Sequence, residues 1–543
     1  MEDAPGLPDG FDAERLLDIA RRHHAEGDVD AAWAAVSDLS AHARQAEDPT
    51  TLARAALVIR QPGDRLVRAR VHALAREALT RVEALHARAS EPDHVTTLLA
   101  KRLTSQVAAT RDPFGSDAFQ VAPAQLDPAD LRDPEGSFLA LQARVAELQN
   151  VAHAQERLTL ATRAMALGAA TAVTEYEAWG RRWRMDAFAE LGLRLDVASE
   201  RGAVAPLTER LGTEWRSWLV LTRASDTLLE GDFSTALHLA DEARILGGVG
   251  GFADFFHLVF ASEVAVWTGA GAQDAAAELA GIIEHLPFLA RSWLAIAWLA
   301  AGERDRALDV WRAVRGHVEK MPEDASEWVI GAVSRVDLCE AFSDTVVAQV
   351  LYDQLLPFEG RHAIGAAHAP HHGPIAVALG RLALVLGRPD RARAHLTTGL
   401  AAAEQLQSPP YVGLAHAALA ATYTPGTRAR AEHTAAARAL AERLGSPYLA
   451  DRVAVLGGTA RVLDASVTPR ETEIANLVAE GLTNGAIAQR LMLSERTVEN
   501  HVSHLLHKLD LPTRGTLAVW VRDQADETRR AAETGRDERT AHD

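Results

Sequence analysis

Residues 468–522 read TPRETEIANLVAEGLTNGAIAQRLMLSERTVENHVSHLLHKLDLPTRGTLAVWVR, and this stretch decides how the chain is interpreted. It opens with a capping box, in which Thr468 is followed three residues later by Glu471. Pro469 occupies the position between them that suits the first residue of a helix. The pattern predicts a short helix that begins at Pro469 and stops at Gly481.

Three further short helices are expected in the same stretch. Thr483 can cap the second, which runs through Leu491, and Ser494 can cap the third. The third carries one apolar stripe at steps of four, three and four residues: Val498, Val502, Leu505 and Leu509. A fourth helix is expected after Pro512. The second and third helices have the proportions of a helix-turn-helix, whose second helix lies in the major groove of DNA.

The polar face of the third helix offers groups that could bind DNA. Its members are Arg496, Thr497, Glu499, Asn500, Ser503, His504, His507 and Lys508. Amides, hydroxyls and charged groups of this kind reach base edges and phosphates. The alternative is a solvated polar face on an ordinary helical hairpin, and periodicity alone does not decide between the two.

The stretch also resembles the LuxR/FixJ-type DNA-binding domain of bacterial transcription regulators. The matching residues are Thr468-Pro469-Arg470-Glu471, Gly481-Leu482-Thr483-Asn484, Ile487-Ala488, Leu491, Leu493-Ser494, Thr497-Val498, His501, Lys508-Leu509 and Arg514. The resemblance implies that Glu499, Asn500 and Ser503 face bases. It places Thr497, His501 and Lys508 near the DNA backbone or as braces of the helix.

The polar face of the third helix and the resemblance together predict the full set of DNA-binding residues. It comprises Thr483, Asn484, Ser494, Arg496, Thr497, Glu499, Asn500, His501, Ser503, His504, His507, Lys508 and Arg514. Domains of this type typically pair through their last helix, which implies dimerisation through Leu517, Trp520 and Val521. Two positions depart from the family pattern. Gly485-Ala486 replaces a Lys/Arg-Glu pair, and Glu499 replaces a frequent lysine.

Composition limits the remaining possibilities. The 543 residues are 48% hydrophobic but only 5% aromatic, which favours packed helices with small side chains. The net charge of −18 argues against a chain that coats nucleic acid non-specifically. Residues 468–523 carry six Arg/Lys and seven Asp/Glu, so DNA affinity must come from the placement of a few cations.

Other features point to a soluble, cytoplasmic protein. Cys339 is the single cysteine, so an intrachain disulfide or thiolate metal cluster is excluded. The acidic N-terminal sequence MEDAPGLPDG lacks the apolar segment of a secretory signal. No apolar run reaches the ~18 residues of a membrane helix.

Upstream of the DNA-binding stretch, a glycine followed five residues later by alanine recurs along a helical sequence. The pairs are Gly27/Ala32, Gly231/Ala236, Gly271/Ala276, Gly302/Ala307, Gly387/Ala392 and Gly426/Ala431, with Gly192/Val197 as a weaker member. Glycine suits the turn between two antiparallel helices, and alanine suits their close crossing. The pattern resembles degenerate tetratricopeptide repeats and predicts an all-α solenoid. A globular helical domain is the alternative.

Two segments interrupt these helices. Residues 111–136 contain three Asp-Pro steps and predict a surface loop or a break between solenoid halves. Residues 361–374 contain His362, His368, His371 and His372 among glycines and prolines. A flexible loop that borders a pocket is the favoured interpretation, with a zinc or copper site as the alternative. The three-residue steps of His501, His504 and His507 are likewise attributed to DNA contacts rather than metal.

The expected domains are a solenoid over 1–445, a connecting helix and linker over 446–467, the DNA-binding domain over 468–523 and a disordered charged tail over 524–543. A solenoid before a LuxR-type domain resembles the C-terminal half of the large MalT-like regulators. Those carry an ATPase module, whereas here no glycine-rich loop ends in Gly-Lys-Ser/Thr. The chain is therefore expected to be a relative without the ATPase, or one half of a split system.

These observations favour a transcription regulator that binds double-stranded promoter DNA, as a homodimer, while its solenoid senses a small-molecule or protein effector. The alternative is a protein-interaction scaffold with weak or vestigial DNA binding, which the two departures and the acidic balance favour. An enzyme is not expected, because no nucleophile–base pair, metal motif or phosphate loop is visible. No cofactor and no membrane partner are expected.

Overall fold

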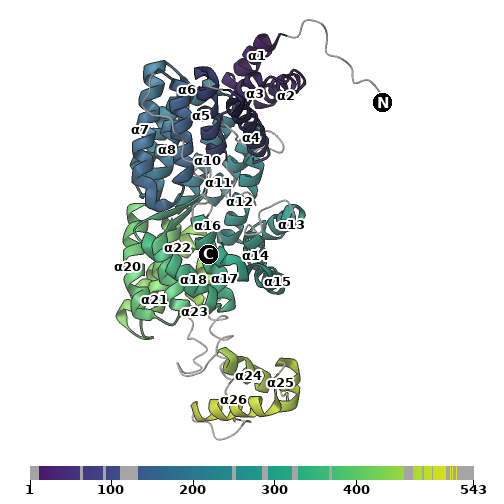
Figure 1. The fold of residues 1–543 in the computed structure, drawn as a ribbon. Coiled ribbons are helices and arrows are strands. Elements are labelled where there is room, and N and C mark those ends of the chain that lie inside the picture. Colours follow the sequence, from purple (N-terminus) through teal and green to yellow (C-terminus); the bar gives the residue numbers. More distant parts are fainter. Residues whose placement is uncertain are drawn as a thin grey trace. The chain divides into compact units, whose positions relative to one another are not determined.

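A computed structural model describes residues 12–60, 65–89, 93–110, 132–247, 252–283, 291–320, 328–365, 370–457, 469–479, 482–491, 493–508, 514, 516–517 and 521. The chain forms two compact units, Met1–Asp451 and Arg452–Asp543. The described part is almost entirely helical, which confirms the all-α prediction of a solenoid followed by a small helical domain (Figure 1). No described helix is long and apolar enough to cross a membrane.

The first unit is a succession of helices, most of which pack against their neighbours in the chain. Its first half contains α1 (Ala13–Ala25), α2 (Val29–Gln45), α3 (Pro49–Ala56), α4 (Arg65–Arg88), α5 (His94–Ala109), α6 (Pro134–Glu147), η1 (Val151–His153), α7 (Ala154–Thr171), α8 (Thr174–Glu190), α9 (Arg194–Leu211) and α10 (Thr213–Glu230). Its second half contains α11 (Phe233–Gly247), α12 (Phe252–Thr268), α13 (Ala272–Ile282), α14 (Arg291–Ala300), α15 (Arg304–Val314), η4 (Arg315–Lys320), α16 (Trp328–Ser334), α17 (Val336–Phe342), α18 (Thr345–Leu355), η5 (Leu356–Phe358), β1 (His362–Ile364), β2 (His371–Pro374), α19 (Ile375–Val385), α20 (Pro389–Gln405), α21 (Pro409–Ala421), α22 (Arg428–Leu444) and α23 (Pro447–Gly457).

The glycines of the recurring pattern occupy the turns between helices. All seven have a positive φ, between 68° and 83°, a conformation that glycine adopts without steric cost. The residues five positions later are buried at the crossings: Ala32, Ala236, Ala276, Ala307 and Ala392 are 0% exposed and Val197 is 3% exposed. The prediction is wrong at Ala431, which is exposed. Helix α22 instead buries Thr434, Ala437 and Ala441, so its packing begins only after its first turn.

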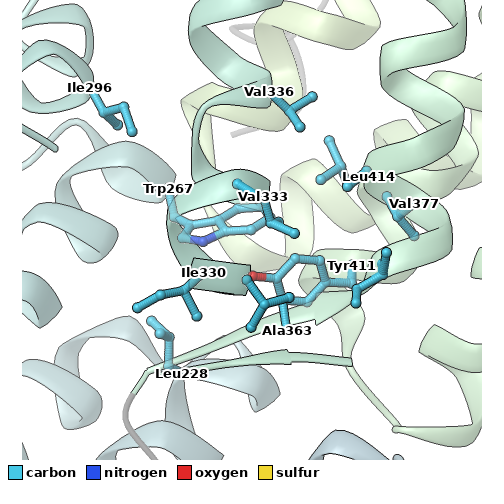
Figure 2. Close-up of a cluster of buried hydrophobic side chains, with 14 of the residues drawn as sticks. Leu228, Trp267, Ile296, Ile330, Val333, Val336, Ala363, Val377, Tyr411 and Leu414 are labelled. Carbon is cyan, nitrogen blue, oxygen red and sulfur yellow. The ribbon is translucent and has the colours of Figure 1, made fainter. Parts of the chain in front are cut away.

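The histidine-rich segment is not the flexible surface loop that its glycines and prolines suggested. Strands β1 and β2 form an antiparallel hairpin, in which His362 pairs with Pro374 and Ile364 with His371. All described residues of both strands are buried. The hairpin contacts α8 and α10 from the first half and α16, α19 and α20 from the second, and Figure 2 shows part of the hydrophobic core beside it.

Two glycines allow the hairpin to pack this closely. A Cβ on Gly192, in the α8–α9 turn, would lie 2.4 Å from His362 Nε2. A Cβ on Gly373 would lie 2.4 Å from the Tyr411 ring, and Gly373 also has a φ of +76°. The Tyr411 hydroxyl donates to the carbonyl of His371 at 3.3 Å. Tertiary packing therefore fixes a segment that the local sequence marks as a loop.

The predicted interruption over 111–136 overlaps the start of α6. Residues 111–131 lie outside the described residues, but α6 begins at Pro134 and packs directly on α5. Asp133 caps α6 by accepting a hydrogen bond from Gly136 N at 3.0 Å. Arg102 of α5 pairs with Asp133 and with Glu135. The helices on either side of this segment therefore pack on each other, and the expected break between halves is not found between α5 and α6.

A seam joins the end of the first unit to its middle. The Ser408 hydroxyl, at the start of α21, donates to the carbonyl of Leu229 near the end of α10 at 2.7 Å. The Ser446 hydroxyl, just before α23, donates to the carbonyl of Trp267 near the end of α12 at 2.6 Å. Both serines are buried. Because each pair is 179 residues apart, the starts of two alternate helices, α21 and α23, meet the ends of two alternate helices, α10 and α12, in the same register.

The connecting helix expected after Gly445 is α23. Its first turn belongs to the core of the first unit, since Leu449 is 0% exposed and Tyr448 donates to Asp337 at 2.6 Å. The remainder of the expected linker, from 458 to 467, and the expected tail over 524–543 lie outside the described residues.

Candidate nucleic-acid interface

The second unit contains the three helices α24 (Pro469–Ala479), α25 (Asn484–Leu491) and α26 (Glu495–Lys508). Their apolar faces, together with Leu517, meet in one core. Its buried members are Ile474, Ala475, Leu477, Val478, Ile487, Ala488, Val498, Val502, Leu505 and Leu517. The stripe predicted for the third helix is thus confirmed for its first three residues, while Leu509 lies outside the described residues.

Capping side chains define where α25 and α26 begin. Thr483 Oγ1 accepts a hydrogen bond from Ala486 N at 3.2 Å, and Ser494 Oγ accepts one from Thr497 N at 3.1 Å. Both hydroxyls satisfy backbone N–H groups that a helix leaves without intrahelical partners. Leu493 N donates to the carbonyl of Ala488 and thereby closes the short turn between the helices. The two helices with this turn form the predicted helix-turn-helix.

The outer face of α26 presents the residues predicted to read DNA. Five of them are exposed: Arg496, Glu499, Asn500, Ser503 and His504. They recur at three- and four-residue steps, so they share the side of the helix opposite the buried stripe. Thr497 and His501 are half-buried at the edges of this face, which fits a bracing position better than a central one. The side chains of His507 and Lys508 lie outside the described residues.

Arg514 and Asn484, both predicted to bind DNA, are engaged with each other. Arg514 Nη1 donates to Asn484 Oδ1 at 2.5 Å, and its Nη2 donates to the carbonyl of Leu482. Burial lowers the pKa of Arg514 from its usual value. These contacts tie the segment after α26 to the loop before α25. Sequence reasoning did not foresee this bracing role, which needs the two segments to be close in space.

Of the predicted dimerisation residues, Leu517 and Val521 are described by the structure. Leu517 is 0% exposed and belongs to the core of the unit, and Val521 packs against the same core. A side chain buried within its own domain is not available as a contact for a second copy, so the assignment of Leu517 needs correction. Trp520 lies outside the described residues.

The departure at Gly485 leaves an acidic group beside the start of α25. A Cβ added at Gly485 would lie 3.4 Å from Glu495 Oε1, in ordinary van der Waals contact. Glu495 stands in the first turn of α26, where the helix dipole favours a negative charge. A lysine or arginine at position 485 could therefore form an ion pair with Glu495, and glycine cannot.

A helix-turn-helix with an exposed polar face on its second helix is typical of DNA-binding proteins. Residues 465–521 match the family described as "Bacterial regulatory proteins, luxR family". The C-terminal unit of this chain thus carries a luxR-family DNA-binding domain, as its resemblance implied.

Relatives extend this comparison. The nitrate/nitrite response regulator protein NarL of Escherichia coli K12 is 41% identical over 97 residues, which cover 18% of this chain and 44% of that protein. The DNA-binding transcriptional activator DevR/DosR of Mycobacterium tuberculosis is 43% identical over 70 residues, 12% of this chain and 32% of that protein. The chain thus spans less than half of the length of either relative.

Similarity to a third relative reaches outside the second unit. The putative HTH-type transcriptional regulator Rv0890c of Mycobacterium tuberculosis is 27% identical over 284 residues, 44% of this chain and 30% of that protein. This share is larger than the second unit, so the match includes part of the helical first unit. Rv0890c and DevR/DosR are described as transcriptional proteins, while the family is described as regulatory proteins and NarL as a response regulator.

Among the described residues, no group of three or more His, Cys, Asp or Glu side chains is placed to hold a metal ion. His362, His371 and His372 are each buried, and burial lowers the pKa of His362 and of His372 to about 4. His368 lies outside the described residues.

Proposed function

We propose that this protein regulates transcription by placing α26 in the major groove of promoter DNA, under the control of its helical first unit. The observation that carries the proposal is the division of α26 into two faces. Val498, Val502 and Leu505 anchor the helix in the core, while Asn500 and its exposed neighbours remain available to a partner. The luxR-family match supports the same assignment for residues 465–521.

Within this proposal, the exposed residues have distinct tasks. Asn500 can form two hydrogen bonds with adenine, and Glu499 can accept one from cytosine, whereas Arg496 can bind guanine or a phosphate. Thr483 and Ser494 position the helices through their caps. Asn484 and Arg514 brace the adjoining loop, and any phosphate contact they make is secondary to that role.

The deciding experiment selects sequences from random double-stranded DNA with the full chain. The expected result is a discrete motif that Asn500→Ala loses, because a base contact is removed while the folded unit is kept. Glu278→Gln, a substitution of an exposed residue on α13, serves as the matched control and should keep the motif. Enrichment of no motif by the wild type would contradict the proposal.

A scaffold with weak DNA binding is the second candidate, and one observation favours it. The DNA-binding stretch 468–523 has seven acidic and six basic residues, unlike a surface adapted to phosphate. The same selection distinguishes the two functions, since a scaffold would show only salt-sensitive binding without sequence preference.

A further inference from the structure

A small cavity lies in the first unit beside the hairpin, with a volume of about 40 Å³. Its walls come from both sides of the seam. Glu263 and Trp267 belong to α12, while Tyr411 and Tyr448 belong to α21 and α23. Since one water molecule needs roughly 10–15 Å³ of such space, the cavity has room for about three waters or for a ligand of a few non-hydrogen atoms.

The cavity carries more acid than base. Its one arginine, Arg381, is 5% exposed and donates to Asp337 and, at 2.9 and 2.6 Å, to Glu340. The Tyr448 hydroxyl donates to Asp337 at 2.6 Å. Asp337 and Glu340 thus already neutralise the positive charge of Arg381. The carboxyl group of Glu263 is a further acidic group of the cavity.

Glu263 has no arginine or lysine within ion-pair distance among the described residues. Its nearest basic group is His372, whose Nδ1 lies 3.5 Å from Glu263 Oε1. Burial lowers the pKa of His372 to about 4, so this imidazole is neutral near pH 7. Burial and the nearby charge of Asp337 raise the pKa of Glu263 to about 8. The carboxyl group of Glu263 is therefore protonated at neutral pH.

A second polar group of the cavity wall also lacks a partner. The Nε2 atom of His372 is buried and has no hydrogen-bond partner among the described residues, and the whole side chain is 5% exposed. A buried polar atom without a partner costs about 1–3 kcal/mol, which a bound polar group can recover. With the Glu263 carboxyl group ionised and the imidazole proton on Nδ1, the two residues offer two acceptors to a ligand that donates hydrogen bonds.

Aromatic rings complete the wall. Trp267 packs edge-to-face with Tyr411 at 5.7 Å between centroids and with Tyr448 at 5.0 Å. Figure 2 shows Trp267 and Tyr411 side by side, with Val333 and Val377 around them. Ring faces attract cations, most strongly where water is excluded.

We propose that this cavity is the effector site of the first unit and that it binds a small organic ammonium ion, held by Glu263 and His372 beside the rings of Trp267 and Tyr411. The inference rests on the proposed function, in which the first unit receives a signal. Binding would tie α12 to α21 and α23 across the seam. Helix α23 also contains the boundary between the two units, so a ligand beside Tyr448 acts on the helix that leads to the DNA-binding unit.

The test is calorimetric titration of the full chain at pH 7 with three probes of similar size. Ethylammonium should bind saturably, whereas ethanol and acetate should not. Glu263→Gln should weaken ethylammonium binding at least about 10-fold. The wild type should also release close to one proton on binding, measured in two buffers of different ionisation enthalpy, and Glu263→Gln should release none. Glu278→Gln, on the exposed side of α13, is the matched control and should behave as the wild type.

Two results would overturn the proposal: equal binding of ethanol or acetate, or unchanged ethylammonium affinity in Glu263→Gln. Should Glu263→Gln fail to fold, Ala378→Val tests the same cavity by filling it without a change of charge, and it should abolish binding. DNA binding is measured separately on the same protein. If the chain selects a DNA motif but does not bind ethylammonium, the effector-site proposal is wrong and the proposed function stands. If it binds ethylammonium but selects no DNA motif, the promoter-binding function is wrong and the effector site stands.

Discussion

Glu499 stands exposed on α26, one residue before Asn500, where luxR-type domains frequently carry lysine. If Glu499 reads a base, Glu499→Lys should change the preferred sequence at one position by about 1–3 kcal/mol and raise affinity for random DNA. Lys508→Ala should weaken binding to all sequences about equally, because a phosphate contact carries no base information. Selection of DNA motifs by the wild type and both variants provides the measurement.

The competing explanation for Glu499 is a favourable interaction with the helix dipole, without contact to a base. In that case, Glu499→Lys would leave the motif unchanged and only steepen the salt dependence. An unchanged motif would therefore show that the base-reading role is wrong.

Gly373 combines a positive φ with a close approach to the Tyr411 ring, and the two effects can be separated. Gly269 has a similar φ of +70°, but nothing lies within 4 Å of an added Cβ. Gly269→Ala should lower the free energy of unfolding by about 1–2 kcal/mol, because alanine is strained at a positive φ. Gly373→Ala should cost a further ~1–3 kcal/mol, because the methyl group overpacks the hairpin against Tyr411. Urea unfolding of both variants measures this difference, and equal losses would contradict the packing of the hairpin.

Glu263 also makes the stability of the first unit depend on pH. Its pKa is about 8 when folded and about 4.5 ordinarily, so between these values the folded state holds a proton that the unfolded state has lost. The free energy of unfolding should then fall as pH rises, by up to about 1.4 kcal/mol per unit. Besides His372, the groups that line the cavity with Glu263 are Asp337, Arg381, Tyr411 and Tyr448.

Comparison with Glu263→Gln isolates this contribution. The lowered pKa of His372 has the opposite effect on stability, but only between pH of about 4 and 6.5, and it is present in both proteins. The expected result between pH 6.5 and 8.5 is that wild-type stability falls relative to the variant. Parallel curves in denaturant titrations at several pH values would rule out a raised pKa for Glu263.

At the scale of a helix pair, the crossing positions set how closely neighbouring helices approach. Ala307 is 0% exposed, five residues after Gly302, whereas Ala431 holds the same position after Gly426 but is exposed. Ala307→Leu should overpack the crossing and cost about 1–3 kcal/mol, while Ala431→Leu should change little. Thermal unfolding of the two variants is the measurement. An unchanged melting temperature for Ala307→Leu would contradict the close packing at that crossing.

The elements that the sequence predicted well are those determined by local patterns. The apolar stripe of α26, its cap at Ser494 and the position of the repeat glycines in turns between helices each follow from neighbouring residues. The hairpin was missed because its glycines and prolines indicate a loop, and only contacts with helices distant in sequence make it a buried strand pair. The burial of Leu517 was also missed, because it depends on contacts with helices that precede it in the chain.

At the scale of the whole chain, the first unit is held together by contacts between its middle and its end. Ser408 and Ser446 satisfy the carbonyls of Leu229 and Trp267 in one register, and the cavity with Glu263 lies among the helices joined there. No periodic pattern in the sequence predicts this seam, because each hydrogen bond connects residues that are 179 positions apart. A ligand that binds at the seam can therefore change the stability of the whole unit.

The number of chains bound to each DNA site is a property of the complete protein. The described part of the second unit offers one recognition helix, which reads only a short half-site, so two copies related by a two-fold axis are expected on each site. Half-sites should then lie about one helical turn apart. Since Leu517 is buried in its own domain, the contact between copies must use other residues. Sedimentation of the full chain with DNA of one or two half-sites, together with footprinting, measures the stoichiometry. One chain per DNA with a single protected half-site would contradict dimeric binding, because a second copy would necessarily add both mass and a second footprint.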